Sequence, residues 1–211
     1  KVSFTPNNTV VNPQIDVTVF GSYTLQLEST NGTSVSCTDD ASVTLTFVDN
    51  PAAVAGSDAE ICDGSTYGLT GSATNADTYT WTVLGGRTGN FTPSANGLNP
   101  TFEPTDGIGT YTLQLEASQS AGTCPAATSS MDIDVIAIPV VNAGADNDMC
   151  GSTYTIADAT STGASHVWTV TVGDPTKVSF TPNNTVLNPQ IDVTVFGSYT
   201  LQLESTNGTS V

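Results

Sequence analysis

One pattern of alternating apolar and polar residues recurs three times along the chain. Residues 21–28 read GSYTLQLE, and nearly the same residues return at 109–116 and 197–204. In each copy a tyrosine and two leucines alternate with threonine, glutamine and glutamate, so one face of a β-strand is apolar and the other is polar. Copies of one half-buried strand at a fixed interval of 88 residues predict a tandem repeat protein.

A longer part of the chain is repeated almost without change. Residues 1–35 and 177–211 are identical except that Val11 corresponds to Leu187. Identity of this extent goes far beyond what a shared fold requires and indicates recent tandem duplication. The repeat of 176 residues is itself made of two diverged units of 88. We therefore expect the sequence to be a window on a longer repeat array, with neither end at a natural domain boundary.

One complete unit spans residues 50–137, and its strand signals are separated by turn residues, with no stretch of helical periodicity. About seven short strands in some 90 residues, with a tryptophan near the middle, are typical of an immunoglobulin-like sandwich. The predicted fold class is therefore all-β, with tandem immunoglobulin-like sandwich domains. The strands are expected near residues 52–55, 66–69, 78–83, 101–103, 111–116 and 131–135.

The two flanking stretches are predicted to be incomplete copies of this unit. Residues 1–49 correspond to the C-terminal part of a domain that is truncated at its start. Residues 138–211 repeat the strand order of the complete domain but lack its last strand, whose counterpart lies within residues 36–48. We call residues 1–49, 50–137 and 138–211 the first, middle and third units.

The connections between the units are short and contain proline. They read Asp49-Asn50-Pro51 and Ala137-Ile138-Pro139. Proline fixes the φ angle of its own residue, and so few residues leave little hinge freedom. The units are therefore expected to stack into an elongated array.

Charge excludes several classes of partner. The chain has three Lys and Arg against twenty Asp and Glu, a formal net charge of −17. Such an acidic chain has no electrostatic footprint for nucleic acid or for an anionic membrane surface. No apolar run approaches the length of a transmembrane helix, so membrane insertion by this segment is not expected.

The four cysteines are too widely spaced for a zinc site and instead suggest disulfides in an oxidising, extracytoplasmic setting. Cys62 precedes the second expected strand of the middle unit, and Cys124 follows the Tyr111 strand, so we expect these two to pair. Cys150 is the counterpart of Cys62. Cys37 and Cys150 would then find their partners outside this chain.

Candidate chemistry is sparse. Acidic residues cluster just after the interdomain prolines, where carboxylates and backbone carbonyls could supply the oxygen ligands of calcium. No Asp-x-Asp-x-Asp-Gly loop is present, and plain surface charge is the competing interpretation. No other cofactor is expected. The calcium candidates are Asp58, Glu60, Asp63, Asp146 and Asp148.

Catalysis is not expected. His166 is the single histidine, and it is better explained as a packed residue that replaces Tyr79. Asp132 and Asp134 alternate on what should be the exposed face of a strand. Trp81 and Trp168 could stack on sugars, but their alternation with other apolar residues favours the core.

Several segments together resemble a known family. These are PAAVAGSDAEICDGSTYGL (51–69), PVVNAGADNDMCGSTYTI (139–156), the TYTWTV and HVWTVT strands, and the G-[ST]-YTLQLE strand. As a set they resemble the PKD-like, immunoglobulin-like repeats of giant cell-surface adhesins of the Bacteroidetes, of the SprB gliding-motility type. The Trp-Asp-Phe-Gly-Asp-Gly turn of the core PKD family is missing, since Trp81 is followed by Thr-Val-Leu-Gly-Gly.

The resemblance implies secretion to a bacterial cell surface and a multi-domain filament that serves attachment or gliding motility. The expected partners are neighbouring repeats of the same protein, with surface polysaccharide or substratum as further candidates. The alternative is a carbohydrate-binding module that acts by avidity from many weak sites.

Overall fold

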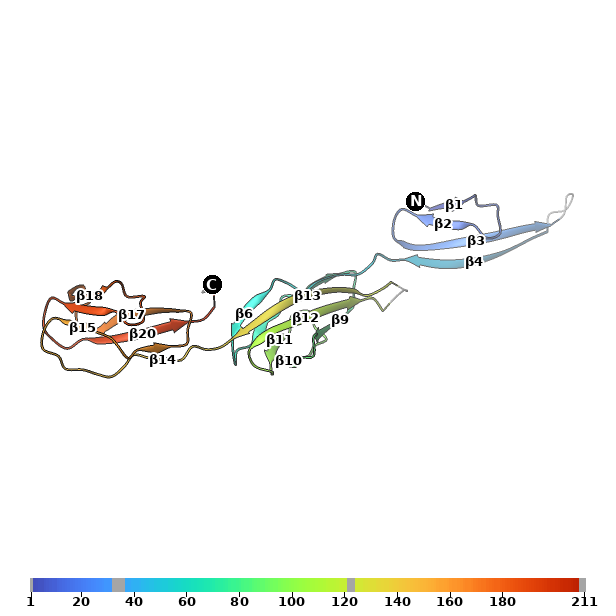
Figure 1. Ribbon diagram of the computed structural model, residues 1–211. Coiled ribbons are helices and arrows are strands. Elements are labelled where there is room, and N and C mark those ends of the chain that lie inside the picture. Colours follow the sequence, from blue (N-terminus) through green and yellow to red (C-terminus); the bar gives the residue numbers. More distant parts are fainter. Residues whose placement is uncertain (1, 32–36, 121–123, 209–211) are drawn as a thin grey trace.

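The computed structural model describes residues 2–31, 37–120 and 124–208. It is all-β apart from one 3-10 turn, η1 (Pro175–Lys177), so the described part of the chain has no helix long and apolar enough to span a bilayer. Three groups of strands follow one another in a row (Figure 1). All strand pairings within the described residues join strands of the same unit.

The middle unit is a sandwich. One face is the four-stranded sheet β6-β13-β12-β9, and the other is formed by the sheets β10-β11-β7 and β5-β8. Strand β13 runs antiparallel to β12 and parallel to β6. The strands are β5 (Ala52–Val54), β6 (Ala59–Cys62), β7 (Tyr67–Gly68), β8 (Ser72–Thr74), β9 (Thr78–Val83), β10 (Gly89–Thr92), β11 (Thr101–Pro104), β12 (Gly109–Ser118) and β13 (Ala127–Ile136).

The alternation along β12 and β13 builds the core of this sandwich. Tyr111, Leu113 and Leu115 of β12 are completely buried, while the residues between them are more exposed. Strand β13 contributes a second row of inward side chains, and the opposite sheets and β9 close the core over both rows. The other members of this core are Ala55, Leu69, Trp81, Phe102, Met131, Ile133 and Val135.

A hydrogen bond of the same kind marks the start of the recurring strand in all three units. The hydroxyl of Tyr111 donates to Gly107 O at 2.9 Å, that of Tyr23 to Val19 O at 2.6 Å, and that of Tyr199 to Val195 O at 2.8 Å. Each tyrosine thus reaches a carbonyl four residues upstream. This is the tyrosine corner found in immunoglobulin-like domains.

The third unit repeats the order of the middle unit, except that residues 147–150, the counterpart of β6, form no strand and no counterpart of β13 follows β20 among the described residues. Its pairings are β14-β16, β17-β20 and β15-β19-β18, and its smaller core includes Trp168, Ile191 and Leu203. Among the described residues, strand β20 pairs with β17 alone. The strands are β14 (Val141–Asn142), β15 (Thr153–Thr155), β16 (Thr160–Ser161), β17 (Ser165–Val172), β18 (Val178–Thr181), β19 (Gln190–Val193) and β20 (Thr200–Thr206).

The first unit contains two hairpins. Strand β1 (Val2–Thr5) pairs with β2 (Gln14–Val17), and β3 (Gly21–Asn31) pairs with β4 (Cys37–Phe47). Its apolar face is only partly covered, since Leu27 is 55% exposed and Val43 is 53% exposed. The equivalent residues of the middle unit, Leu115 and Met131, are buried.

Replacing Tyr111 with phenylalanine should destabilise the middle unit by about 1–2 kcal/mol, because the hydroxyl makes two hydrogen bonds there. It donates to Gly107 O and accepts from the backbone N–H of Asp106 at 2.9 Å. Denaturant unfolding measures the loss. Tyr199→Phe removes the single bond to Val195 O and should cost less; an equal or larger loss for Tyr199→Phe would contradict this account.

Candidate functional site

The same contact fixes the connection between units at both junctions. The side-chain amide of Gln119 donates to Asp49 O at 2.9 Å, and that of Asn207 donates to Ala137 O at 2.8 Å. Both the donors and the acceptors are 88 residues apart. In each case the amide lies just beyond the recurring strand of the following unit and holds the first residue of the linker. We call these two hydrogen bonds the junction clamps.

A second contact ties the third unit to the middle unit. Gly208 lies so close to Glu60 and to the side chain of Ile136 that a β-carbon at this position would overlap both. The φ angle of Gly208 is +82°, a backbone conformation that favours glycine. Glycine therefore lets the chain beyond β20 approach the end of β13, beside the clamp on Ala137.

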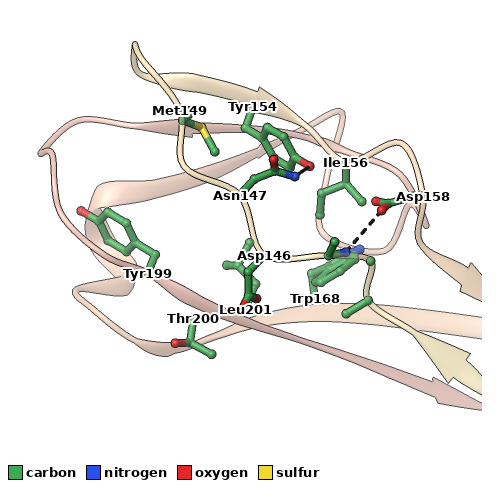
Figure 2. A pocket seen from close by; sticks show the side chains of 13 residues that line it. Asp146, Asn147, Met149, Tyr154, Ile156, Asp158, Trp168, Tyr199, Thr200 and Leu201 are labelled. Atoms are coloured by element: carbon green, nitrogen blue, oxygen red, sulfur yellow. Dashed lines mark hydrogen bonds between the residues drawn. The ribbon is translucent and has the colours of Figure 1, made fainter.

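The third unit has an open groove beside β20. Two adjoining cavities, of about 190 Å³ and about 420 Å³, share Tyr154, Tyr199 and Leu201 as lining residues. Figure 2 shows Tyr154 and Ile156 on one side of the first cavity and Leu201 with Trp168 on the other.

The middle unit shows what fills the equivalent space. Tyr199 and Leu201 correspond to Tyr111 and Leu113. In the middle unit, Tyr111 pairs with Ile133 of β13, and Leu113 pairs with Met131 of the same strand. The groove of the third unit therefore lies on the side of β20 that corresponds to the β13 side of β12. Its lining mixes apolar side chains such as Ile156 and Leu201 with polar ones such as Asp146 and Asn147.

The acidic residues singled out as calcium candidates are not gathered into one site. Asp58 accepts a hydrogen bond from the backbone N–H of Asp132 at 2.8 Å, and Glu60 lies on β6. Asp146 and Asp148 border the groove of the third unit. Within the described residues, no group of three or more His, Cys, Asp or Glu side chains is placed to hold a metal ion. Asp63 is an exposed residue in the turn after β6.

The expected Cys62–Cys124 disulfide is not formed, and this prediction is corrected by the structure. Both thiols are free. Cys62 pairs in register with Ile136 at the end of β13, whereas Cys124 precedes Ala127 at the beginning of the same strand. The nine residues between those ends span about 30 Å, several times the Cα separation that a disulfide permits.

The expected partners of Cys37 and Cys150 lie outside this chain, so their pairing stays a prediction. Cys37 begins β4, the counterpart of β13, and Cys150 occupies the position of Cys62 near the opposite end. Both are free and exposed. The Cys62–Cys124 pairing was wrong because two loops of one sandwich can lie at opposite ends of it, however close they are in the strand order.

The tryptophans belong to the core, as predicted. Trp81 and Trp168 are each 2% exposed, and their indole N–H groups donate to Leu98 O at 3.2 Å and to Leu187 O at 3.0 Å. Buried indoles with satisfied N–H groups leave no face for stacking on a sugar. His166 is half-buried on β17, opposite Ser205.

Two acidic side chains lie on the outer face of β13. Asp134 is exposed and accepts a hydrogen bond from Thr110 Oγ1 at 2.5 Å, and Asp132 is half-buried.

Three other aspartates accept hydrogen bonds in the loops of the sandwiches: Asp77 and Asp106 link separate segments, and Asp174 closes a local turn. The Ser120 hydroxyl and backbone N–H lower the pKa of Asp77 from its ordinary value. The hydroxyl and backbone N–H of Thr88 lower the pKa of Asp106. The hydroxyl and backbone N–H of Thr176 lower the pKa of Asp174 in the same way. Sequence reasoning missed these residues, although the spacing Asp-x-Thr at Asp174 is a recognisable turn signal.

No protein-family profile and no characterised protein sequence matches the chain. Among solved structures, the chain is similar to the N-terminal eight Ig domains of Down Syndrome Cell Adhesion Molecule, isoform 1.30.30. That similarity has 14% identity and a TM-score of 0.45, and it covers 90% of this chain and 31% of that one. The ectodomain of human desmocollin-1 matches at 12% identity and a TM-score of 0.34, over 92% of this chain and 46% of that one.

An endo-fucoidan hydrolase of glycoside hydrolase family 107 matches at 17% identity and a TM-score of 0.32, over 99% of this chain and 36% of that one. The chain spans about a third of the length of the Down Syndrome Cell Adhesion Molecule structure. Similarities this distant do not carry function. The all-β, immunoglobulin-like fold rests on the topology and the repeated tyrosine corner of the chain itself.

Asp106 should make the middle unit sensitive to acid. Its pKa in the folded state is lowered, so it stabilises the fold above the unfolded pKa of about 3.9, and that contribution is lost as the pH falls through the folded pKa. Melting temperature measured from pH 6 to pH 2 should fall less steeply in Asp106→Asn than in the wild type.

Glu116→Gln is the matched control, because it removes the same charge from the exposed face of β12. It should leave the pH dependence close to that of the wild type. Identical profiles for Asp106→Asn and the wild type would show that the contacts with Thr88 do not contribute to the acid sensitivity.

Proposed function

We propose that this chain is a structural repeat segment of a long extracellular filament or adhesin stalk on a bacterial cell surface, with a role in attachment or gliding motility. In this proposal the three units are successive immunoglobulin-like domains, and their main partners are neighbouring repeats of the same protein. The SprB-type resemblance supports the cellular setting.

The observation that carries the proposal is the repeated junction. Two linkers of different sequence are held by the same hydrogen bond, from Gln119 to Asp49 O and from Asn207 to Ala137 O. A linker that is fixed at its carbonyl and contains proline transmits the direction of one unit to the next. Repetition of one such junction extends a chain in a regular way, which is what a stalk requires.

Composition fits this role. A net charge of −17, with almost no compensating cations, makes neighbouring stalks repel one another and keeps them soluble. Stability is local to each sandwich and its neighbour contacts, as in other repeat proteins, so the array can be lengthened without a new fold.

The cellular setting can be tested on the source cells. Antibodies raised against residues 50–137 should label intact cells along surface fibres in immunogold electron microscopy. Labelling that appears only after the cells are permeabilised would overturn the extracellular assignment.

Loss of the junction clamps should loosen the array without unfolding its units. Strand β12 alone spans about 33 Å, so three units in a row extend to roughly 100 Å. Small-angle X-ray scattering of the wild type should give a radius of gyration well above the value of about 17 Å expected for a compact chain of this length. The double variant Gln119→Ala, Asn207→Ala should show a broader distribution of intramolecular distances at an unchanged melting temperature.

The control is Gln114→Ala, Gln202→Ala, which removes side-chain amides from β12 and β20 away from the linkers. It should scatter like the wild type. A compact wild type, or clamp variants indistinguishable from this control, would contradict the role of the junctions.

A further inference from the structure

We propose that the dipeptide Asn207-Gly208 is a site of spontaneous chemical modification, and that its reaction opens the junction between the middle and third units. Deamidation converts Asn207, whose amide clamps Ala137 O, into aspartate or isoaspartate. The other junction is clamped by Gln119 and does not undergo this reaction at a comparable rate. The effect on the junction rests on the proposed role of the junction clamps, whereas the reaction itself does not.

The reaction needs only the chain and water. The backbone nitrogen of Gly208 attacks the side-chain carbonyl carbon of Asn207 and forms a carbon–nitrogen bond to it. The side-chain amide then leaves as ammonia, together with the proton of the Gly208 nitrogen. Water opens the resulting succinimide ring at one or the other of its carbonyl groups, which gives aspartate or isoaspartate. Glycine favours the attack because no β-carbon crowds its nitrogen or restricts the backbone.

In the closed junction the side chain of Asn207 is held at both of its polar atoms. Its amide N–H donates to Ala137 O at 2.8 Å, and its carbonyl oxygen accepts from the backbone N–H of Ala164 at 2.9 Å. Rotation of the side chain toward the Gly208 nitrogen requires that these bonds open first. The reaction rate in the folded chain is therefore the intrinsic rate multiplied by the fraction of time that the clamp is open.

The equivalent position of the middle unit is protected in two ways. Gln119 has one more methylene than asparagine, so attack on its side chain would have to form a larger and less favoured ring. The attacking nitrogen would be that of Ser120, whose backbone N–H donates to Asp77 Oδ1 at 2.9 Å. The hydroxyl of Ser120 donates to the same carboxylate. Both the side chain and the nitrogen are thus unsuited to the reaction.

The third unit lacks this carboxylate. Ala164 stands in the place of Asp77, because each donates its backbone N–H to the last residue of the recurring strand. The two acceptors are Thr206 O at 2.9 Å and Ser118 O at 3.0 Å. The methyl side chain of Ala164 cannot accept a hydrogen bond. The two clamps therefore look alike at the linker but differ in their chemical stability.

The product of the reaction detaches from the middle unit but not from its own unit. A carboxylate has no hydrogen to donate to Ala137 O, so the two oxygens repel each other. The backbone N–H of Ala164 can still donate to a carboxylate oxygen. The new negative charge also lies near Glu60 of the middle unit, because Gly208 packs against that side chain. Deamidation thus replaces an attraction across the junction with repulsion.

The chain contains an internal reference for this reaction. Asn-Gly also occurs at residues 31–32 and 96–97. Asn96 is exposed, and its side chain makes no hydrogen bond with the described residues. Asn96 should therefore react faster than Asn207 in the folded chain. In denaturant, where the clamp is absent, the two rates should be similar.

The first test is mass spectrometry of the 211-residue chain after long incubation at physiological temperature, folded and in denaturant. Trypsin cleaves only after Lys1, Arg87 and Lys177, so each Asn-Gly dipeptide falls in a separate peptide. Asn207 should convert in both samples, and more slowly than Asn96 only in the folded one. An unmodified Asn207 in folded chains whose Asn96 has fully reacted would overturn the proposal. Equal rates at Asn207 and Asn96 in the folded chain would show that the clamp does not control the reaction.

Ala164→Asp transfers the protective carboxylate of the middle unit to the third unit. Ala164 is exposed, so the substitution is compatible with the fold. A hydrogen bond from the Gly208 nitrogen to this carboxylate should slow the reaction of Asn207 by about tenfold. The rate at Asn96 is the control and should not change. An unchanged rate at Asn207 would contradict the role assigned to this position.

Small-angle X-ray scattering tests the effect on the junction. After incubation, the wild type should show a broader distribution of intramolecular distances, and Asn207→Asp should show it from the start. Asn207→Gln is the matched control, because it keeps an amide donor, as at Gln119, and reacts far more slowly. It should keep the narrow distribution after the same treatment, although its Asn96 reacts.

The outcomes separate this inference from the proposed function. If the modified wild type scatters like Asn207→Gln while Gln119→Ala, Asn207→Ala is broadened, the inference alone is overturned. If that double variant also scatters like Asn207→Gln, the role of the clamps fails as well. Conversion of Asn207 with a broadened distribution supports the inference, whatever the labelling of intact cells shows.

Discussion

Each unit of this chain depends on the burial of one alternating strand. Tyr111, Leu113 and Leu115 are completely buried only because β13 lies on one side of β12, β9 lies on the other, and the opposite sheets cover the shared face. A sheet with one apolar face has no stable form in water unless that face is covered. The middle unit meets this requirement in full, and the flanking units meet it in part.

The consequences are visible in the exposure of identical side chains. The recurring strand is almost the same in the first and third units, yet Leu27 is 55% exposed and Leu203 is 6% exposed. The difference comes from β17, which packs Trp168 against the strand in the third unit.

The junctions add direction to this repetition. Pro51 and Pro139 restrict the linkers, and the clamps from Gln119 and Asn207 hold the carbonyl of the first residue of each linker. The two amides were not recognised from the sequence, since asparagine and glutamine are common in loops and nothing in the local pattern assigns them a partner 70 residues away. A comparison of positions 88 residues apart would have placed Gln119 and Asn207 together as equivalents.

The sequence by itself determined the strand alternation, the repeat of 88 residues and the buried tryptophans, because these follow from local periodicity and from comparing copies. Strands as short as β6 and β10 carry little periodic signal, and only pairing with β13 and β11 makes them strands. The tertiary structure also decided that Cys62 and Cys124 remain apart. Spacing along the chain says which residues are equivalent, but the register of β6 on β13 decides which ends of the sandwich they occupy.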